Sequence, residues 1–345
     1  MFVAPQVVST YVALSQFSQN MGDRDKWLQC EQMAIQKSSL CWFSREGLLA
    51  TAQLMQALAY TKLCLGHLDF SIKLGFQAHE ICRHLKKPAL ENLVLSVLFR
   101  SAFLKKKFDL CVHVLESQWA LISQGRDVLG LACFYSACLD LLLYGKGLLC
   151  RPFGECLHFI QHCEHSCILN SQSNVMLGVH SSLAMWFAQD SQWNLFEHHF
   201  SKARQLVKRT NASLFGSHGF VRFLECHVLV LQKMPEGVFM HTPPETRSQT
   251  LKYCEEFFSR CVTCPVYHQW VSELKASIMR YGKRESMSST NIVRPFDTCL
   301  TRIWIEGEFL EENNSFGRNL GIQRFDRVAD VKENKDEEEI KDCVC

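Results

Sequence analysis

The residue types best suited to chemistry gather in the stretch GECLHFIQHCEHSC, residues 154–167. It contains six candidate metal ligands: Cys156, His158, His162, Cys163, His165 and Cys167. Zinc is bound by thiolates and imidazoles that converge tetrahedrally. On a helix, His158 and His162 share one face, and Cys163 and Cys167 share the adjacent face. No second half-site at zinc-finger spacing follows, so His162, Cys163 and Cys167 stand as metal candidates against the alternative of ordinary core and surface positions.

Three further motifs have a possible chemical meaning and a simpler structural one. Cys261 and Cys264 form a CxxC motif, but a redox role needs a thioredoxin-type βαβ setting. We expect two half-buried thiols at a helix end instead. His198 and His199 lack the HExxH spacing of zinc proteases, and the Gly-Lys-Gly at 145–147 is not part of a phosphate-binding GxxxxGK[ST] loop. The sequence therefore predicts no catalytic residue, no cofactor-binding residue and no cofactor in this chain.

The last three residues, Cys343-Val344-Cys345, match the CXC ends that receive prenyl groups. They do not form a CaaX box, because position 342 is Asp. This modification also needs a small-GTPase context, of which the sequence gives no sign. The role of this end is left open.

Composition limits the partners and the compartment. The chain has 345 residues, of which 47% are hydrophobic, with 37 basic and 35 acidic residues. A net charge of +2 gives no broad basic field, so we expect no nucleic-acid partner. The 18 cysteines are scattered among apolar residues, which indicates reduced, buried thiols in the cytoplasm. The most apolar stretch, 128–149, contains Asp140 and Lys146, so we expect a buried helix and no membrane span.

Helical periodicity dominates the chain. Between Gly66 and Pro88, one helix face collects five apolar residues, Phe70, Leu74, Ala78, Ile81 and Leu85. The segment before Gly66 has a second stripe of the same kind, Leu48, Ala52, Met55, Ala59 and Leu63. Neither helix can bury its stripe alone, so the two should pair antiparallel across a tight turn at Gly66.

This helix pair recurs along the chain. Equivalent turns are predicted at Gly22, Gly66, Lys106, Gly147 and Asp190, with a period of 40–44 residues. Two helices per unit at this period are typical of an α-solenoid. The units resemble tetratricopeptide repeats with longer helices, and a last, looser pair follows. We therefore predict an all-α, tetratricopeptide-like α-solenoid of antiparallel helix pairs.

The domain organisation follows from composition. Residues 1–281 should form the helical-repeat array. Residues 282–312 begin as a polar, serine-rich linker and could end in a terminal helix or arm. Residues 313–345 are polar and charged, which predicts disorder.

Several segments are similar in amino-acid sequence to members of a known family. Examples are KKKFDLCVHVLESQWALISQGR, FGSHGFVRFLECHVLVLQKM and FSREGLLATAQLMQALAYTKLCLGHLDFSIKLGFQAHEICRHLKKPAL. Over roughly residues 1–310 the chain resembles the C-terminal helical region of the mammalian soluble adenylyl cyclases, the type 10 adenylate cyclases. The resemblance rests on overall sequence similarity and not on a diagnostic motif.

The resemblance implies a multidomain enzyme whose chemistry lies elsewhere. That family joins two class III cyclase domains to an NTPase-like segment and a long repeat region. It converts ATP to cyclic AMP and pyrophosphate with divalent metal, responds to bicarbonate and calcium, and is cytosolic, with links to cytoskeleton, mitochondria and nucleus. The metal-binding aspartates and transition-state residues of its cyclase domains have no counterpart here. The resemblance thus implies a C-terminal fragment, a truncated isoform or a partial gene product that is inactive alone.

Three hypotheses about function follow. The first is an interaction protein whose concave face binds a protein partner or packs against upstream cyclase domains. The second is a part of a cyclase that contributes regulation and not turnover. The third is a metal-dependent helical module built around His162 and Cys163.

Overall fold

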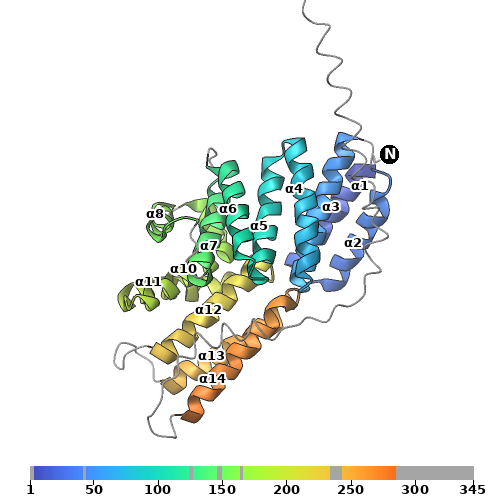
Figure 1. Ribbon diagram of the computed structural model, residues 1–345. Helices are drawn as coiled ribbons and strands as arrows, with labels where there is room; N and C mark the ends of the chain where they lie inside the picture. Colours follow the sequence, from blue (N-terminus) through green and yellow to red (C-terminus); the bar gives the residue numbers. More distant parts are fainter. Residues whose placement is uncertain are drawn as a thin grey trace, which may run out of the picture. The chain divides into compact units, whose positions relative to one another are not determined.

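The computed structural model describes residues 4–41, 44–123, 127–145, 150–163, 166–233 and 243–284. Within these ranges the chain forms fourteen α-helices, two short 3-10 helices and no strand (Figure 1). The predicted all-α, solenoid-like fold is confirmed. Of the predicted linker and tail, 282–312 and 313–345, only residues 282–284 are described, and they end the last helix.

The helices follow one another as antiparallel hairpins. The first three hairpins are α1 (Ala4–Asn20) with α2 (Arg24–Ser38), α3 (Arg45–Cys64) with α4 (Leu68–Leu85), and α5 (Pro88–Leu104) with α6 (Phe108–Ile122). Next come α7 (Val128–Tyr144), α8 (Phe153–Cys163), the short α9 (Cys167–Ser171), α10 (Ser173–Gln189) and α11 (Trp193–Leu206). The last are α12 (Leu214–Lys233), α13 (Pro243–Arg260) and α14 (His268–Arg284), with 3-10 turns η1 (Val207–Arg209) and η2 (Pro265–Tyr267). The helices α9 and α14 were not predicted from the sequence.

Four hairpins turn on the same backbone motif. The turn residue adopts the left-handed conformation, with φ of 79° at Gly22, 87° at Gly66, 57° at Lys106 and 59° at Ser191. At Gly66, two N–H groups reach back to the end of α3, His67 N–H to the Lys62 carbonyl at 2.8 Å and Gly66 N–H to the Leu63 carbonyl at 3.0 Å. The other three turns repeat both bonds, which is the Schellman pattern that satisfies terminal helix carbonyls.

The predicted turns agree with this pattern with one small shift. Gly22, Gly66 and Lys106 are the turn residues themselves, whereas the turn expected at Asp190 is centred on the next residue, Ser191. The turn expected at Gly147 lies outside the described residues.

A buried position recurs five residues after each left-handed turn residue. It is occupied by Trp27, Ser71, Cys111 and Phe196, each with a relative exposure of 0%. Trp27 Nε1 donates a hydrogen bond to Thr61 Oγ1 at 3.1 Å, and the hydroxyls of Ser71 and Ser101 lie 2.8 Å apart. The second helix of each of these hairpins therefore contacts the first helix of the next, which is how the array propagates.

The array is not open from end to end. The first helices stack in order, α1 on α3, α3 on α5, α5 on α7, α7 on α10 and α10 on α12. The start of α12 then returns to α3, where the Leu214 N–H donates to the Tyr60 hydroxyl at 2.7 Å. The Sγ atoms of Cys264 and Cys64 lie 3.4 Å apart. In Figure 1, α12 and α14 run obliquely to α3–α6 and begin beside their lower ends.

The core helix of this arrangement is α12. Its window Leu214–Leu231 is long and apolar enough to cross a membrane by length and composition, yet 83% of it is buried inside the structure. Arg222 and Glu225 lie within the window and have a relative exposure of 0%. The predicted apolar stretch at 128–149 begins with α7, which is shorter than a membrane span and also largely buried.

The turn geometry can be tested with glycine substitutions. A Cβ added at Gly22 would meet nothing within 4 Å, so Gly22→Ala should cost only left-handed strain, about 1–2 kcal/mol of unfolding free energy. Gly154→Ala, with equally open space in a helical conformation, should be neutral or stabilise by up to about 1 kcal/mol. Lys106→Gly relieves strain and should not destabilise. Urea denaturation measures all three, and equal losses for both alanine variants would contradict the turn assignment.

Candidate functional site: a buried ion-pair network

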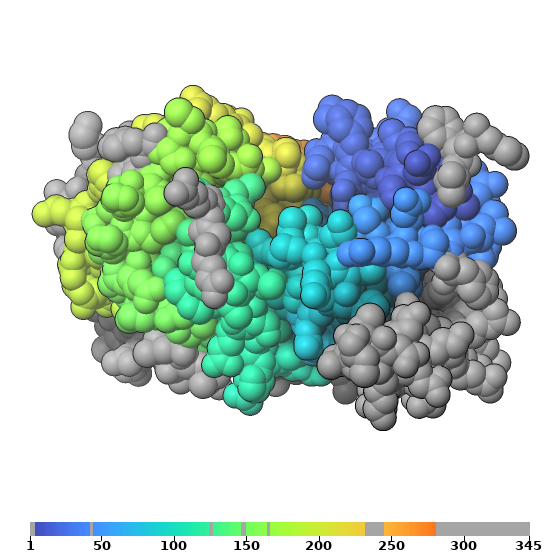
Figure 2. Space-filling model, turned by 90° about the horizontal axis from the view of Figure 1, so that it is seen from above, coloured from blue at the N-terminus to red at the C-terminus, as the bar shows by residue number. Residues whose placement is uncertain are grey.

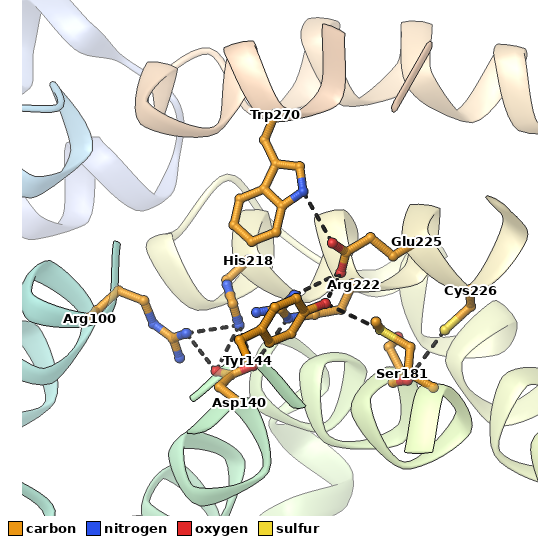
Figure 3. A network of polar contacts seen from close by, with 10 residues as sticks. Arg100, Asp140, Tyr144, Ser181, His218, Arg222, Glu225, Cys226 and Trp270 are labelled. Atoms are coloured by element: carbon orange, nitrogen blue, oxygen red, sulfur yellow. Dashed lines mark hydrogen bonds and ion pairs between the residues drawn. The ribbon is translucent and has the colours of Figure 1, made fainter. Parts of the chain in front are cut away.

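Five ionisable side chains from three helices, α5, α7 and α12, meet in the interior (Figure 3). They are Arg100 on α5, Asp140 on α7, and His218, Arg222 and Glu225 on α12. Each has a relative exposure of 3% or less. Charges this deeply buried are tolerated only when they are paired and hydrogen-bonded. The network therefore fixes which faces of the three helices must meet.

Asp140 is the hub of the network. Its Oδ2 accepts a hydrogen bond from Arg100 Nη1 at 2.6 Å, and its Oδ1 accepts one from Arg222 Nε at 3.1 Å. His218 Nε2 lies 2.9 Å and 3.1 Å from the two carboxylate oxygens. His218 Nε2 also lies 2.8 Å from Arg100 Nη1. Three side chains from two other helices thus converge on one carboxylate of α7.

Glu225 forms the second half of the network. Its Oε2 accepts from Arg222 Nη1 at 2.7 Å and from the Tyr144 hydroxyl at 2.9 Å, and its Oε1 accepts from Trp270 Nε1 at 3.1 Å. The Arg222 guanidinium also lies 4.0 Å from the centre of the Tyr144 ring. Trp270 extends the network to α14, so four helices are joined.

The charges of the network balance when His218 is neutral. Burial, reinforced by Arg100, lowers the pKa of His218 to about 3, so the ring is uncharged at neutral pH. Burial works against ionisation of Asp140, but its cationic neighbours outweigh burial and hold the pKa well below its usual range. Burial raises the pKa of Glu225 despite its hydrogen bonds from Arg222 and Tyr144. Two guanidinium groups then face two carboxylates.

This arrangement is suited to holding helices together and not to turnover. With relative exposures of 0–3%, the ionisable groups are shielded from any dissolved substrate. His218 Nδ1 and Arg222 Nη2 have no hydrogen-bond partner within the part of the chain that the structure describes. The hydrogen bonds that the Asp140 carboxylate makes join α7 to Arg100 of α5 and to His218 and Arg222 of α12. We therefore interpret the network as a device that sets helix register.

The predicted metal candidates lie at the α8–α9 corner. His158 and His162 are exposed, Cys163 is half-buried and Cys167 is exposed, while Cys156 is part of the core. His165 lies outside the described residues. Among the described residues, no group of three or more His, Cys, Asp or Glu side chains is placed to hold a metal ion. A site at His162, Cys163 and Cys167 stays a hypothesis for metal titration.

The CxxC motif lies where the array closes. Cys261 and Cys264 sit just after α13, and both are buried, more deeply than the half-buried thiols expected from sequence. Burial raises the pKa of Cys261 to about 12, so it stays a thiol. The Sγ atom of Cys264 lies 3.4 Å from the Sγ atom of Cys64 on α3. All cysteines of the described ranges are free, and most are buried, as the composition indicated.

Of the two histidines of FEHHF, His198 is exposed and His199 belongs to a buried aromatic cluster. His199 on α11 is buried, and its Nδ1 lies 3.1 Å from Nδ1 of His180 on α10. Nearby, the ring of His227 on α12 contacts Phe200, Phe223 and Tyr253. Burial lowers the pKa of His180 to about 3, of His199 to about 4 and of His227 to about 3. These imidazoles are neutral packing groups between α10, α11 and α12.

Comparison with known proteins identifies the relatives of this helical array. No family model matches the chain. Over 273 residues, 79% of the chain, it is 31% identical to adenylate cyclase type 10 of Oryctolagus cuniculus and of Mus musculus. Over 262 residues, 76% of the chain, it is 30% identical to adenylate cyclase type 10 of Homo sapiens. The chain is homologous to a segment of adenylate cyclase type 10.

The match covers only a small part of the length of the cyclases. The chain spans only 16–17% of the length of these curated relatives. The segment matched lies outside the catalytic domains of adenylate cyclase type 10. The resemblance predicted from the sequence is confirmed, and with it the placement of this array apart from the cyclase chemistry.

Sequence reasoning did not find the network, although a signal was present. Arg100, Asp140 and Arg222 each interrupt a long apolar run, in LVLSVLFRSAF, ACLDLLLY and FVRFLECHV. A charge that must be buried requires a partner. In the sequence, Asp140 argues against a membrane span, but its partners in the folded chain are not apparent. The partner of each charge depends on how the array curves, which periodicity does not give.

The two ion pairs of α5 offer a matched test of burial. Asp140→Ala removes the partner of two buried guanidinium groups and should lower the free energy of unfolding by about 3–5 kcal/mol. Asp69→Ala breaks the pair between Asp69 and Lys105, whose side chains are 72% and 34% exposed, and should cost at most about 1 kcal/mol. Chemical denaturation compares the two, and similar losses would show that the network is not what holds α5, α7 and α12.

The histidine cluster predicts a loss of stability in mild acid. The folded-state pKa values of His180, His199 and His227 are lowered, so the unfolded chain binds more protons once the pH falls below about 6.5. Stability is therefore full above that pH and declines steadily towards pH 4.

The substitution His227→Phe removes one imidazole from the cluster and keeps an aromatic ring in its place. At pH 5.5 this variant should take up about one proton fewer on unfolding than the parent chain, because the buried imidazole of His227 is replaced by a ring that does not titrate. Urea unfolding between pH 7.5 and 5 measures the slope. An unchanged slope for His227→Phe would mean that this imidazole is not buried in neutral form.

Proposed function

We propose that this chain is a non-catalytic helical-repeat region that regulates or scaffolds a cyclase in cyclic AMP signalling. The observation that supports the proposal is the 31% identity to adenylate cyclase type 10 over 79% of the chain. We place its action in the cytoplasm. Its proposed partners are proteins, with cyclase catalytic domains as the first candidate. ATP and divalent metal would bind those domains and not this chain.

The packing supports a structural role over an enzymatic one. Asp140 and His218, whose pKa values are both lowered, are buried in the interior between α5, α7 and α12. A stacked array of hairpins presents extended surface, because each unit needs only its neighbours for most of its contacts. Such a surface suits a protein partner.

The closure of the array covers part of its surface and so limits the surfaces that a partner can bind. The side of α5 and α7 that carries Arg100 and Asp140 is covered by α12. The edge of α3 at Tyr60 and Cys64 is covered by the start of α12 and by the link before η2. An extended peptide along this inner side, as in the concave-face hypothesis, would have to displace α12. We therefore favour a partner at the ends or the outer helices of the array.

The alternative is a stand-alone, tetratricopeptide-like interaction module that is unrelated to cyclase activity. Left-handed turns at a repeat of 40–44 residues favour a repeat module of this general kind, whatever its partner. The two candidates differ in whether a cyclase responds to the chain.

Two assays separate these functions. The purified chain, given ATP with Mg²⁺ or Mn²⁺, should form no cyclic AMP above background. The catalytic domains of adenylate cyclase type 10, mixed with the folded chain, should bind it and change their rate of cyclic AMP formation at least twofold. The Asp140→Ala variant, with its helix packing broken, serves as the matched control and should have no such effect.

Metal-dependent turnover by the chain alone would contradict the non-catalytic reading. Binding of other proteins without any effect on the cyclase would favour the stand-alone module.

A further inference from the structure

The first helix of the array carries an apolar stripe that the described helices leave uncovered. Three side chains along one side of α1 and of the turn that follows it are well exposed, Leu14 at 46%, Phe17 at 65% and Met21, the first residue after α1, at 69%. Their spacing places them along one helix side. The opposite side of α1 packs on α3, for example through the hydrogen bond from Gln16 to Gln56. In Figure 2 the blue α1–α2 hairpin lies at one end of the described array.

The repeat register shows what the same face does in the other hairpins. Counted back from the left-handed turn residue, Leu14 is equivalent to Leu58, Leu98 and Leu183. Those three leucines have relative exposures of 6%, 0% and 0%. Only at the α1 position does this repeated leucine lie open to solvent among the four hairpins with a described turn.

The element that covers this face elsewhere is the second helix of the preceding hairpin. Leu98 lies against Gly75 of α4, where a Cβ on the glycine would come within 3.2 Å of the leucine Cδ1. Phe17 is equivalent to Thr61, Ser101 and Trp186. The Trp186 ring stacks on Phe153 of α8, with the ring centroids 4.5 Å apart.

Thr61 and Ser101 are the same two residues that meet α2 and α4. Thr61 receives the hydrogen bond from Trp27 of α2, and Ser101 pairs with Ser71 of α4. The face of α1 marked by Leu14 and Phe17 is therefore the receiving face of the hairpin-to-hairpin contact.

We propose that the stripe of Leu14, Phe17 and Met21 is the docking surface for the second helix of another helical hairpin of the array's own type. Terminal repeats that end an array need a polar outer face, and α1 has an apolar one. This deepens the proposed function, since it gives the chain a defined surface for a protein partner.

A duplicated hairpin tests whether the surface binds the second helix of a hairpin of the array's own type. A copy of residues 44–87 is joined in front of Ala4, so that its last helix meets α1 as α4 meets α5. We expect hydroxyl-radical labelling of Phe17 and Met21 to fall at least threefold. Val262 and Met279, which are 47% and 45% exposed elsewhere, should label as before.

The matched control changes only the added copy. Ser71→Asp and Gly75→Asp in the duplicate place charges on its docking side and should restore labelling of Phe17. Unchanged labelling with the unaltered copy, when circular dichroism shows that the added residues are helical, would overturn the proposal. Because this readout involves no cyclase, its failure is distinct from failure of the proposed function.

Self-association is the competing outcome. Sedimentation equilibrium of the unmodified chain should show a monomer. If the chain instead forms oligomers that Phe17→Glu dissolves, the occupant is a second copy of the chain, and the proposal of a separate hairpin is wrong.

Discussion

The fold depends on one buried carboxylate and the two guanidinium groups that neutralise it. Asp140 lies in the interior, where an unpaired charge would be strongly unfavourable. Arg100 and Arg222 come from helices that are far from it along the chain. Apolar stripes would tolerate small shifts between α5, α7 and α12, whereas these hydrogen bonds tolerate few. The network therefore supplies the specificity that apolar packing alone lacks.

Much of the fold could be predicted because its causes are local. The stripe from Phe70 to Leu85 and the turn at Gly66 follow from helical periodicity and from the conformational freedom of glycine. Spacing even located the turn at Lys106, where the residue type gives no hint. The homology to adenylate cyclase type 10 could also be predicted from the amino-acid sequences of the helices.

The candidate site could not be predicted because its causes are not local. Arg100 and His218 are separated by 118 positions, and they meet only because the array curves until α12 returns to α5. A sequence shows that Arg100 needs a partner but not that the partner is Asp140. The metal candidates illustrate the reverse case, because helical spacing put His158 and His162 on one face, and that face is exposed.

Closure of the array has a consequence for how such a protein can evolve. An open solenoid can gain or lose a repeat anywhere, because each unit touches only its neighbours. Here the contacts from Tyr60 to Leu214 and from Cys64 to Cys264 span 154 and 200 positions. Insertion of one more hairpin between α3 and α12 would pull these contacts apart. Repeat number is thus constrained inside the closed part, between Tyr60 and Cys264.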